Sequence, residues 1–594
     1  MECCIHWGWV HFAGRIVSLV KMHFSLDRRY LRPYYYGMKM RVAYAKRRYK
    51  EKIYVTPLVV TSYRDAQGVA RNETLANLAK LPEFLVKMVE EALRRGDASV
   101  LEEYVPIREV QYPGSVVVGP AAVALSLLGQ LGIAPLLEEC LPPQQAAAIL
   151  AILLERIVSP KPLSVMAQQR RFEEEGLGML LGRASAPELK TWYAALARLE
   201  SRREEILQGL YERHEAPGDL FLYDITSSYF EGVTCPLGAF GYNRDGKKGK
   251  LQVVIGVLCD ARGCPIWVEV FQGNTADETT IKQQMLTLKT KLGVEEFTFV
   301  GDRGMVTHAR IKELEGEGWW DSFRYITALK RREMMDLVED EDHPIQLELF
   351  DHEHLVEVQD GETRYVLCHN PQRQERDGET RQRLLDRTEA KLEALRKNVE
   401  AGRYKKKDVI ARRLYRWLDH WHMGRFFEVA YDEGAFSFTR RDEEIERYSR
   451  LDGCYVIRSN AQDWKQTTED LRDRYKDLKF VEQVFRTMKT TDIQTRPIRH
   501  FNPPQVRGHI FACFLAYRVI WELRQRLEPI LRRDPDTKRC EAGSLAEVWR
   551  DLATITVAVL RANGKTYHKL SDIRPRAQKI LTLARVSGLE AFAR

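Results

Sequence analysis

The spacing of hydrophobic residues changes along the chain, and the change separates regions of different expected structure. Between residues 81 and 214, apolar positions such as Leu85, Met88 and Val89 recur every three or four residues, which is typical of amphipathic helices. From residue 219 onward, short apolar runs end at Gly, Asp or Asn, as strands do when they lead into turns. We therefore predict a helical region followed by a mixed α/β region.

The mixed region opens with an apolar run of strand length, Leu220 to Ile225, that contains one charged residue, Asp224. A continuous apolar run predicts a strand that is buried on both faces at the centre of a sheet. The elements expected after it are strand 251–259, strand 265–271, helix 274–292, strand 297–300, helix 307–315 and strand 323–329. This β-β-β-α-β-α-β order matches a ribonuclease H-like core.

Residues 331–462 are expected to form an insertion, because the final helix of such a core follows only after them. The insertion is predicted to contain a hairpin at Asp360-Gly361, a long charged helix with leucines at near-heptad spacing, and strands at 426–431, 435–439 and 454–458. The expected fold class is therefore α/β, with a ribonuclease H-like core in two parts, 216–330 and 463–525, and a mixed insertion that contains β-hairpins.

Two smaller regions are predicted before the core. Residues 40–75 form a basic β-hairpin, and residues 76–215 form an all-helical domain that is a candidate for DNA binding. The last helix of that domain, 187–199, carries Lys190, Trp192, Tyr193 and Arg198. This helix fits either a recognition helix of helix-turn-helix type or an amphipathic helix packed in a bundle.

The ends of the chain are predicted separately. Residues 526–594 are expected to be helical. Residues 1–39 show no strand alternation and an irregular mixture of Trp, His and Cys, so we expect them to be non-native upstream sequence, with Met38 or Met40 as the native start.

Composition adds information on domain number and on partners. A chain of 594 residues with 44% hydrophobic content is long enough for two to four domains with their own cores. The net charge of +8 and the clustering of Lys and Arg suggest a polyanionic partner, although solvated helix faces explain many of these clusters equally well.

Cysteine usage and hydropathy argue against several classes of protein. The ten cysteines include no C-x-x-C pair, so neither a zinc site nor a disulfide framework is indicated, and a reducing cytoplasm fits best. No apolar run approaches the roughly 18 residues that a membrane span needs, and the first residues lack the pattern of a signal peptide. We expect a cytoplasmic protein without a membrane partner.

Three carboxylates stand at positions that suggest a site. Asp224 interrupts a buried strand, and Asp302 follows strand 297–300 in the sequence Gly301-Asp302-Arg303-Gly304, at a strand end where sites form in open α/β sheets. Tyr475, Glu482 and Lys489 are seven residues apart, so on one helix they share a face. The alternatives are an Asp224 that caps a turn or meets an Arg, and a Glu482 that pairs with Arg486 on a solvent face.

These residues resemble those of the prokaryotic insertion-sequence DDE transposases, and within that class the superfamily with a Tyr-Arg-Glu-Lys signature, the insertion sequence four type. The signature Y-x-x-R-x-x-x-E-x-x-x-x-x-x-K is similar to Tyr475, Leu478, Glu482 and Lys489, with Leu478 in place of Arg. The resemblance extends from about Asp219 to Leu523, including the segments Arg496-Pro497-Ile498 and Arg507-Gly508-His509-Ile510.

The resemblance implies a DNA transposase with Asp224, Asp302 and Glu482 as catalytic and metal-binding residues. Two Mg²⁺ ions are expected, for which Mn²⁺ can substitute, since hard divalent cations that bind oxygen ligands relieve the repulsion between converging carboxylates. The implied chemistry is nicking at the transposon ends and strand transfer into target DNA. Phosphate contacts are expected from Tyr475, Lys489, Arg486, Lys247 and Lys248.

The implied partners are double-stranded DNA, both at the inverted-repeat ends and in the target, and a second copy of the chain in a homodimeric synaptic complex within a prokaryotic, nucleoid-associated setting. Three alternatives are open. The chain could instead be a structure-selective nuclease of the same fold, a catalytically decayed end-binding protein, or an actin-like phosphotransferase. The last is disfavoured because Ile225 stands where its phosphate loop needs glycine.

Overall fold

The chain divides into two compact units in its computed structural model. Unit 1 comprises residues 1–115, 558–569 and 593–594, and unit 2 comprises residues 116–557 and 570–592. The predicted upstream extension, 1–39, and most of the predicted helix 307–315 lie outside the described residues. Those residues are 40–49, 52–65, 67–95, 110–172, 176–183, 185–214, 218–303, 305–307, 311, 313, 323–340, 342–351, 355–461, 466–491, 493–532, 542–562 and 565–589.

Unit 1 contains a three-stranded antiparallel sheet and a helix. The sheet has the order β1-β2-β3, formed by Met40–Tyr49, Lys52–Arg64 and Ala70–Asn77. Helix α2, Glu83–Arg95, packs on it through Val86 and Val89 against Val59 and Leu78. The predicted hairpin is thus the β2–β3 pair, and the basic segment before it forms a further strand, β1.

A second small sheet corrects two predictions. Its order is β16-β15-β4, with β4 at Gln111–Val117, β15 at Thr556–Ala562 and β16 at Lys565–Leu570. The expectation of helices throughout 81–214 is wrong at β4, and the expectation of a helical C-terminal region is wrong at β15 and β16. Strand β4 pairs with β15 across several hundred residues, which leaves no local signal for the pairing. Strands β15 and β16, by contrast, are separated only by Asn563-Gly564, a typical hairpin sequence that the expectation of helices overlooked.

Unit 2 contains a helical layer built around one long helix, α18, Pro503–Arg526, which is buried along most of its length. Helix α18 contacts α5, Pro143–Val158, α8, Leu189–Ser201, and strand β7 of the large sheet. The other helices of this layer are α3 Gly119–Gln130, α4 Ile133–Cys140, α6 Val165–Arg171, α7 Leu177–Leu180, α9 Arg203–Glu212, α19 Glu528–Leu531, α20 Leu545–Leu552 and α21 Pro575–Leu583.

Helix α8 is the candidate recognition helix of the sequence analysis, and it lies in the core. Trp192 is fully buried, and its indole N–H donates a hydrogen bond to the carbonyl oxygen of Pro187 at 3.0 Å. The backbone of α8 also closely approaches α18, since a Cβ at Gly508 would lie 1.9 Å from the carbonyl oxygen of Leu196. These contacts favour the interpretation of α8 as a packed bundle helix.

Among the described residues no single helix is long and apolar enough to cross a bilayer. Helices α3 and α4 reach the required length and hydropathy only when taken together, and they are bent by 73° relative to each other.

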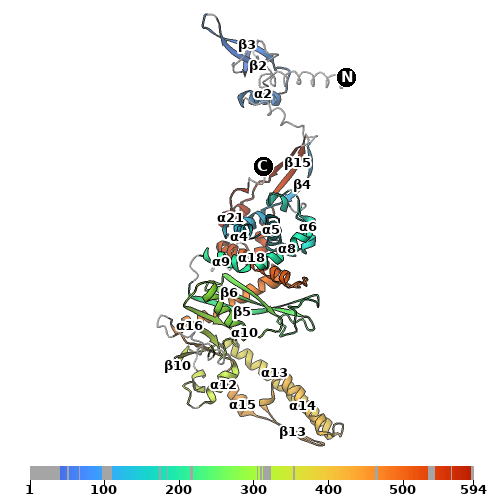
Figure 1. The fold of residues 1–594 in the computed structure, drawn as a ribbon, viewed down its shortest axis with the longest axis vertical. Helices are drawn as coiled ribbons and strands as arrows, with labels where there is room; N and C mark the ends of the chain where they lie inside the picture. Colours follow the sequence, from blue (N-terminus) through green and yellow to red (C-terminus); the bar gives the residue numbers. More distant parts are fainter. Residues whose placement is uncertain are drawn as a thin grey trace. The chain divides into compact units, whose positions relative to one another are not determined.

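A mixed sheet of eight strands lies beside the helical layer in unit 2 (Figure 1). Strands β5 and β8 are parallel, as are β8 and β9, whereas β6 is antiparallel to β5 and to β7. The mixed α/β fold predicted from the sequence is confirmed, and the five predicted strands lie in the order β7-β6-β5-β8-β9. These strands are β5 Leu220–Tyr229, β6 Gln252–Asp260, β7 Pro265–Gln272, β8 Phe297–Gly301 and β9 Phe323–Ala328.

The predicted insertion enters the same sheet. Strands β10, Val356–Asp360, β11, Thr363–His369, and β14, Cys454–Ser459, continue it beyond β9 in the order β10-β11-β14-β9. Between β11 and β14 the chain forms a long helical hairpin, visible in yellow and orange in Figure 1, with a core of its own. The elements of this part are α12 Arg331–Glu339, α13 Pro371–Glu400, α14 Lys407–Trp421, β12 Phe427–Asp432, β13 Ala435–Arg440 and α15 Asp442–Ser449.

The segment predicted as one helix from Tyr475 to Lys489 consists of three pieces. Helix α16, Thr468–Lys476, ends at Asp477, helix α17 spans Leu478–Arg486, and a π-helical turn, η7, spans Thr487–Thr491. A similar π-helical turn, η4 at Thr287–Lys291, follows α10, Asp277–Leu286. The seven-residue rule for a shared face holds only on an uninterrupted α-helix, so the breaks change which way these side chains point.

Candidate active site

The strand register places Asp224 beside Asp302. Tyr223 of β5 is paired with Gly301 of the parallel strand β8, so the next residue of each chain, Asp224 and Asp302, occupies neighbouring positions. Hydrogen-bonded strands are about 4.8 Å apart. Strand β8 ends at this level, whereas β5 continues to Tyr229. Asp224 therefore lies in the middle of a strand, and only Asp302 is at a strand end.

The Asp224 carboxylate is in a poorly solvated position. Burial, together with the charge of Asp302, raises its pKa to about 7, against a hydrogen bond from the backbone N–H of Ile225 at 2.7 Å and the positive charge of Arg244, which favour the ionised form. A second carboxylate close to a buried one disfavours the ionisation of the buried group. A bound cation would therefore stabilise the ionised carboxylates by balancing their charge.

Asp302 is held by two donors. The backbone N–H of Arg303 donates to Asp302 Oδ1 at 2.7 Å, and the Tyr475 hydroxyl donates to the same oxygen at 3.2 Å. Burial and the nearby Asp302 charge raise the pKa of Tyr475 above its usual range, so this hydroxyl stays protonated and remains a donor. Tyr475 thereby orients Asp302 toward the space in front of β5 and β8.

Glu482 is brought to the same place by α17. Val481, Val484 and Phe485 are buried, and α17 contacts β5 and β6, which leaves Glu482 on the exposed side of the helix. A cavity of about 350 Å³ is lined by Asp224, Asp302 and Glu482, together with Tyr475, Leu478, Arg303, Arg373, Tyr455, Lys476 and Lys479. The three carboxylates predicted from the sequence thus share one cavity.

Lys489 points elsewhere. Its ammonium group lies 2.9 Å from Asp245 Oδ1, and Arg496 binds the same buried carboxylate oxygen. Burial lowers the pKa of Lys489, although the Asp245 charge works in the opposite direction. Lys489 therefore does not line the cavity, and the expectation that it shares a face with Tyr475 and Glu482 is wrong, because the break at Asp477 and the π-helical turn intervene.

The remaining predicted DNA contacts lie outside the cavity. Lys247 and Lys248 are exposed in the turn between β5 and β6, where the Asn243 side chain holds the turn through hydrogen bonds to the backbone of Lys247. Arg486 is exposed at the end of α17. Their predicted role in binding phosphate stays a prediction.

Several cavity residues were missed by sequence reasoning. Lys476 and Lys479 flank Leu478 on the segment that carries Glu482, and Arg303 is next to Asp302, so their proximity to the acids was readable from the sequence. Arg373 comes from α13 of the insertion, and no local pattern indicated that this helix reaches the cavity.

Leu478 is both a core residue and a cavity residue. Its exposed fraction is 8%, it belongs to the main hydrophobic core, and it also lines the cavity. The residue that departs from the signature therefore contributes packing to the first turn of α17.

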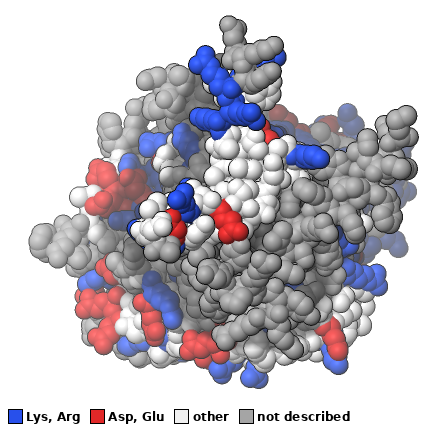
Figure 2. Space-filling model, turned by 90° about the horizontal axis from the view of Figure 1, so that it is seen from above, with Lys and Arg blue, Asp and Glu red and all other residues white. Residues whose placement is uncertain are grey.

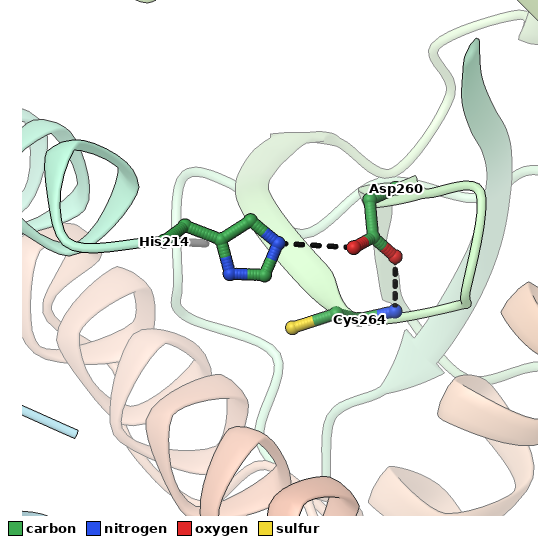
Figure 3. Close-up of side chains that lie close together, drawn as sticks. All are labelled: His214, Asp260 and Cys264. Atoms are coloured by element: carbon green, nitrogen blue, oxygen red, sulfur yellow. Dashed lines mark hydrogen bonds and ion pairs between the residues drawn. The ribbon is translucent and has the colours of Figure 1, made fainter. Parts of the chain in front are cut away.

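A second cluster of metal-ligating residues lies at the turn between β6 and β7 (Figure 3). His214 Nε2 is 2.9 Å from Asp260 Oδ2, and the backbone N–H of Cys264 donates to Asp260 Oδ1 at 2.8 Å. The guanidinium of Arg262 contacts Asp260 at 3.1 Å, that of Arg518 lies 3.5 Å from His214 Nδ1, and burial raises the pKa of Cys264 to about 12. Two cations and a protonated thiol do not fit a bound metal. The cluster instead holds the β6–β7 hairpin against His214, which lies just after α9.

Lys and Arg side chains gather in places on the face that Figure 2 shows. One group of them borders uncharged surface near the upper edge, and Asp and Glu side chains elsewhere stand among further Lys and Arg side chains.

The cavity, its three carboxylates and the mixed sheet that carries them lie within a sequence that matches a known family. Residues 219–519 match the family described as the transposase DDE domain. The match covers half of the chain, and the chain therefore belongs to the DDE transposases. No curated protein matches the chain by sequence.

Solved structures similar to the chain include two transposase complexes. A piggyBac transposase synaptic complex with hairpin DNA is 10% identical, with a TM-score of 0.35, over 69% of this chain and 70% of that one. The Mos1 strand transfer complex is 17% identical, with a TM-score of 0.13, over 40% of this chain and 66% of that one.

Proposed function

We propose that this transposase nicks DNA at the ends of its transposon and joins the freed 3′ ends to target DNA, using a ribonuclease H-like core. The observation that supports this proposal is the single cavity lined by Asp224, Asp302 and Glu482. Phosphoryl transfer needs clustered oxygen ligands more than any protein nucleophile, and the described residues that line this cavity include three carboxylates but no Ser, Cys or His.

The donor set fits divalent metal ions. Asp224, Asp302 and Glu482 present carboxylate oxygens only, which suits Mg²⁺ or Mn²⁺. The pKa of Asp224 is raised mainly by burial and further by the charge of Asp302, and a nearby cation would favour the ionised form. We propose that these three residues hold two Mg²⁺ ions, for which Mn²⁺ can substitute. Bound there, the ions would activate the attacking hydroxyl and stabilise the leaving oxygen.

The other cavity residues act on the DNA. Lys476, Lys479, Arg303 and Arg373 line the cavity with positive charge, and such groups bind the phosphates on either side of the cut. Tyr475 keeps Asp302 in place through its hydroxyl. Lys247, Lys248 and Arg486 would extend the contact along the duplex, and Lys489 would act indirectly by holding the turn that contains Asp245.

The proposal includes the partners implied by the signature. The substrates are the inverted-repeat ends of a prokaryotic insertion sequence of the insertion sequence four type and a target duplex, and two copies of the chain hold the two ends in a synaptic complex. The DNA on either side of the gene tests this directly: short inverted repeats bordered by direct duplications support the proposal, and their absence at every copy contradicts it.

Substitution of the carboxylates tests the mechanism. Asp224→Asn, Asp302→Asn and Glu482→Gln should each abolish Mg²⁺-dependent cleavage and joining, because each removes a metal ligand, while end binding in a gel-shift assay stays within about threefold of the wild type. A matched control is Asp277→Asn, which changes a carboxylate near Asp224 that does not line the cavity. Metal-dependent cleavage by any one of the three variants would remove that residue from the site.

A structure-selective nuclease of the same fold is the second candidate. It would use the same carboxylates to cut DNA but would not join it. An assay with pre-cut ends carrying a free 3′-hydroxyl and a supercoiled target separates the two: joined products support the transposase, and cleavage without any joined product supports the nuclease.

A further inference from the structure

The tip of the β1–β2 hairpin in unit 1 extends beyond the rest of its sheet. Strand β3 pairs with β2 only from Leu58 to Arg64, whereas β1 pairs with β2 over its full length, down to Tyr49 and Lys52. Residues 44–49 and 52–57 therefore form a ribbon of two antiparallel strands without a third strand. We refer to these residues as the ribbon.

The ribbon is positively charged. It carries Lys46, Arg47, Arg48 and Lys52, and β1 and β2 contain no Asp or Glu. Within the described residues, none of these four side chains forms an ion pair. By contrast, the cations of the neighbouring helix α2 are engaged: Lys87 binds Glu83, and Arg94 and Arg95 bind Glu91. The ribbon thus keeps its positive charges available for an external anion.

The ribbon also exposes apolar side chains beside those cations. Ile53 is 65% exposed, Tyr54 54% and Val55 51%. In the strand register Arg48 is opposite Ile53, Arg47 opposite Tyr54 and Lys46 opposite Val55. Residues that are opposite each other lie on the same face of an antiparallel pair, so each cation stands next to an exposed apolar group. Exposed apolar groups gathered in one place mark an interaction surface.

We propose that the ribbon enters the major groove of duplex DNA. The major groove is about 12 Å wide and admits a two-stranded β-ribbon. In this arrangement Lys46, Arg47 and Arg48 bind phosphates on the two sides of the groove. Tyr54 faces the base edges, where thymine methyl groups offer apolar contact, whereas Ile53, the preceding residue of the strand, lies on the opposite face of the ribbon. This inference rests on the proposed function for the kind of nucleic acid, and it adds a second DNA-binding surface outside the carboxylate cavity.

The salt dependence of binding tests the charges. The triple variant Lys46→Gln, Arg47→Gln and Arg48→Gln should lower the slope of log Kd against log salt by about 2 to 3, since each lost phosphate contact removes about 0.9 from the slope on B-DNA. The control is Lys87→Gln, Arg94→Gln and Arg95→Gln on α2, which removes the same charge from the same unit and should leave the slope within about 0.5. Fluorescence anisotropy of the full chain with a labelled duplex of the inverted repeat measures both. Equal slopes for the two triple variants would overturn the proposal.

Two further measurements test the groove. Dimethyl sulfate methylates guanine N7, which lies in the major groove. The wild type should protect guanines that Tyr54→Ala leaves reactive, and both proteins should melt at the same temperature because Tyr54 is exposed.

The major groove of A-form RNA is too narrow for side chains to read, so double-stranded RNA of the same sequence should bind at least about tenfold more weakly. Equal binding of RNA and DNA, or unchanged protection in the variant, would contradict insertion into the groove.

The outcomes also separate this inference from the proposed function. If the wild type cleaves and joins DNA but the ribbon variants bind like the wild type, the transposase function stands and the ribbon is not a DNA-binding element. If the ribbon variants lose binding and protection while the wild type neither cuts nor joins, the DNA-binding ribbon stands and the proposed chemistry fails.

Discussion

Leu478 packs in the hydrophobic core at a position where the Tyr-Arg-Glu-Lys signature has an arginine. Its side chain is buried in the main core while it lines the carboxylate cavity. A guanidinium placed there must leave the core, and its longer chain must find room among packed neighbours. We expect Leu478→Arg to lower the free energy of unfolding by about 1 to 3 kcal/mol, measured by urea denaturation.

Leu478→Met provides the control for that prediction, because it conserves volume and polarity and should cost less than about 1.5 kcal/mol. Binding of both variants to pre-cut ends should be measured alongside. Tighter end binding by Leu478→Arg with unchanged stability would show that the side chain points into the cavity and that the lost arginine was a phosphate contact.

The buried His509 should make the stability of the protein depend on pH. Burial lowers its pKa to about 3, with a smaller effect from the Arg156 charge, and its Nε2 lies 3.1 Å from the carbonyl oxygen of Thr495. In the unfolded chain a histidine has a pKa of about 6.5. As the pH falls below that value, the unfolded state binds a proton that the native state refuses, so stability decreases by at most about 1.4 kcal/mol per pH unit.

The variant His509→Gln should therefore lose less stability than the wild type when the pH is lowered from about 7 to about 5, because it lacks the group that protonates on unfolding. Chemical denaturation at several pH values measures the difference. The neighbouring His500, whose pKa burial and the charge of His509 also lower to about 3, should give an effect of the same sign that is coupled to that of His509, since the centroids of the two rings are 5.1 Å apart. A pH profile of His509→Gln parallel to that of the wild type would contradict this account.

At the scale of elements, helices α8 and α18 approach each other closely at Gly508. A Cβ at Gly508 would lie 1.9 Å from the carbonyl oxygen of Leu196, so a side chain there must push the helices apart. Gly508→Ala should lower the free energy of unfolding by about 1 to 3 kcal/mol or more. The melting temperature of the purified chain measures this.

Gly129 in α3 is the matched control, since a Cβ there meets nothing within 4 Å. In a helix, Ala replaces Gly with a gain of up to about 1 kcal/mol, so Gly129→Ala should raise the melting temperature slightly. If both variants melt alike, the close approach of α8 and α18 does not contribute to stability.

The elements also explain what could be read from the sequence. The strands of the mixed sheet were predictable because each is a short apolar run with its own turn, and Asp224 and Asp302 could be placed on them for the same reason. The direction of Lys489 could not, because it depends on a break at Asp477 and a π-helical turn. Strand β4 was missed because its partner β15 is distant in sequence, and Arg373 because its position depends on how the insertion folds.

At the scale of the whole molecule, the chain contains more than one hydrophobic core. Leu385, Leu392 and Leu395 of α13 pack with α14 in a core that is separate from the main core of unit 2. Truncating a fully buried leucine costs about 2 to 5 kcal/mol. Leu392→Ala should therefore destabilise the helical hairpin while leaving the mixed sheet nearly as stable as before.

Native-state hydrogen exchange measures this separation. In Leu392→Ala, amides of α13 and α14 should exchange faster and amides of β5 and β6 should keep their rates, and the reverse pattern is expected for Leu258→Ala in β6, a fully buried residue of the main core. A uniform increase in exchange over both regions in either variant would show that the two cores unfold together.

The way the insertion leaves and rejoins the sheet has a consequence for how such enzymes change over evolutionary time. Strands β11 and β14 are neighbours, His369 is opposite Cys454, and the N–H of Asn370 donates to the carbonyl oxygen of Gly453 at 3.0 Å. The segment between them starts and ends at adjacent points, so its length can change at little cost in closure entropy and without moving the strands that carry the carboxylates. The part of the segment beyond Arg373, which lines the cavity, is thus an exchangeable module: a lineage could replace it, and a chimera with another module grafted between residues 374 and 453, which are also close together, should keep its fold and its chemistry.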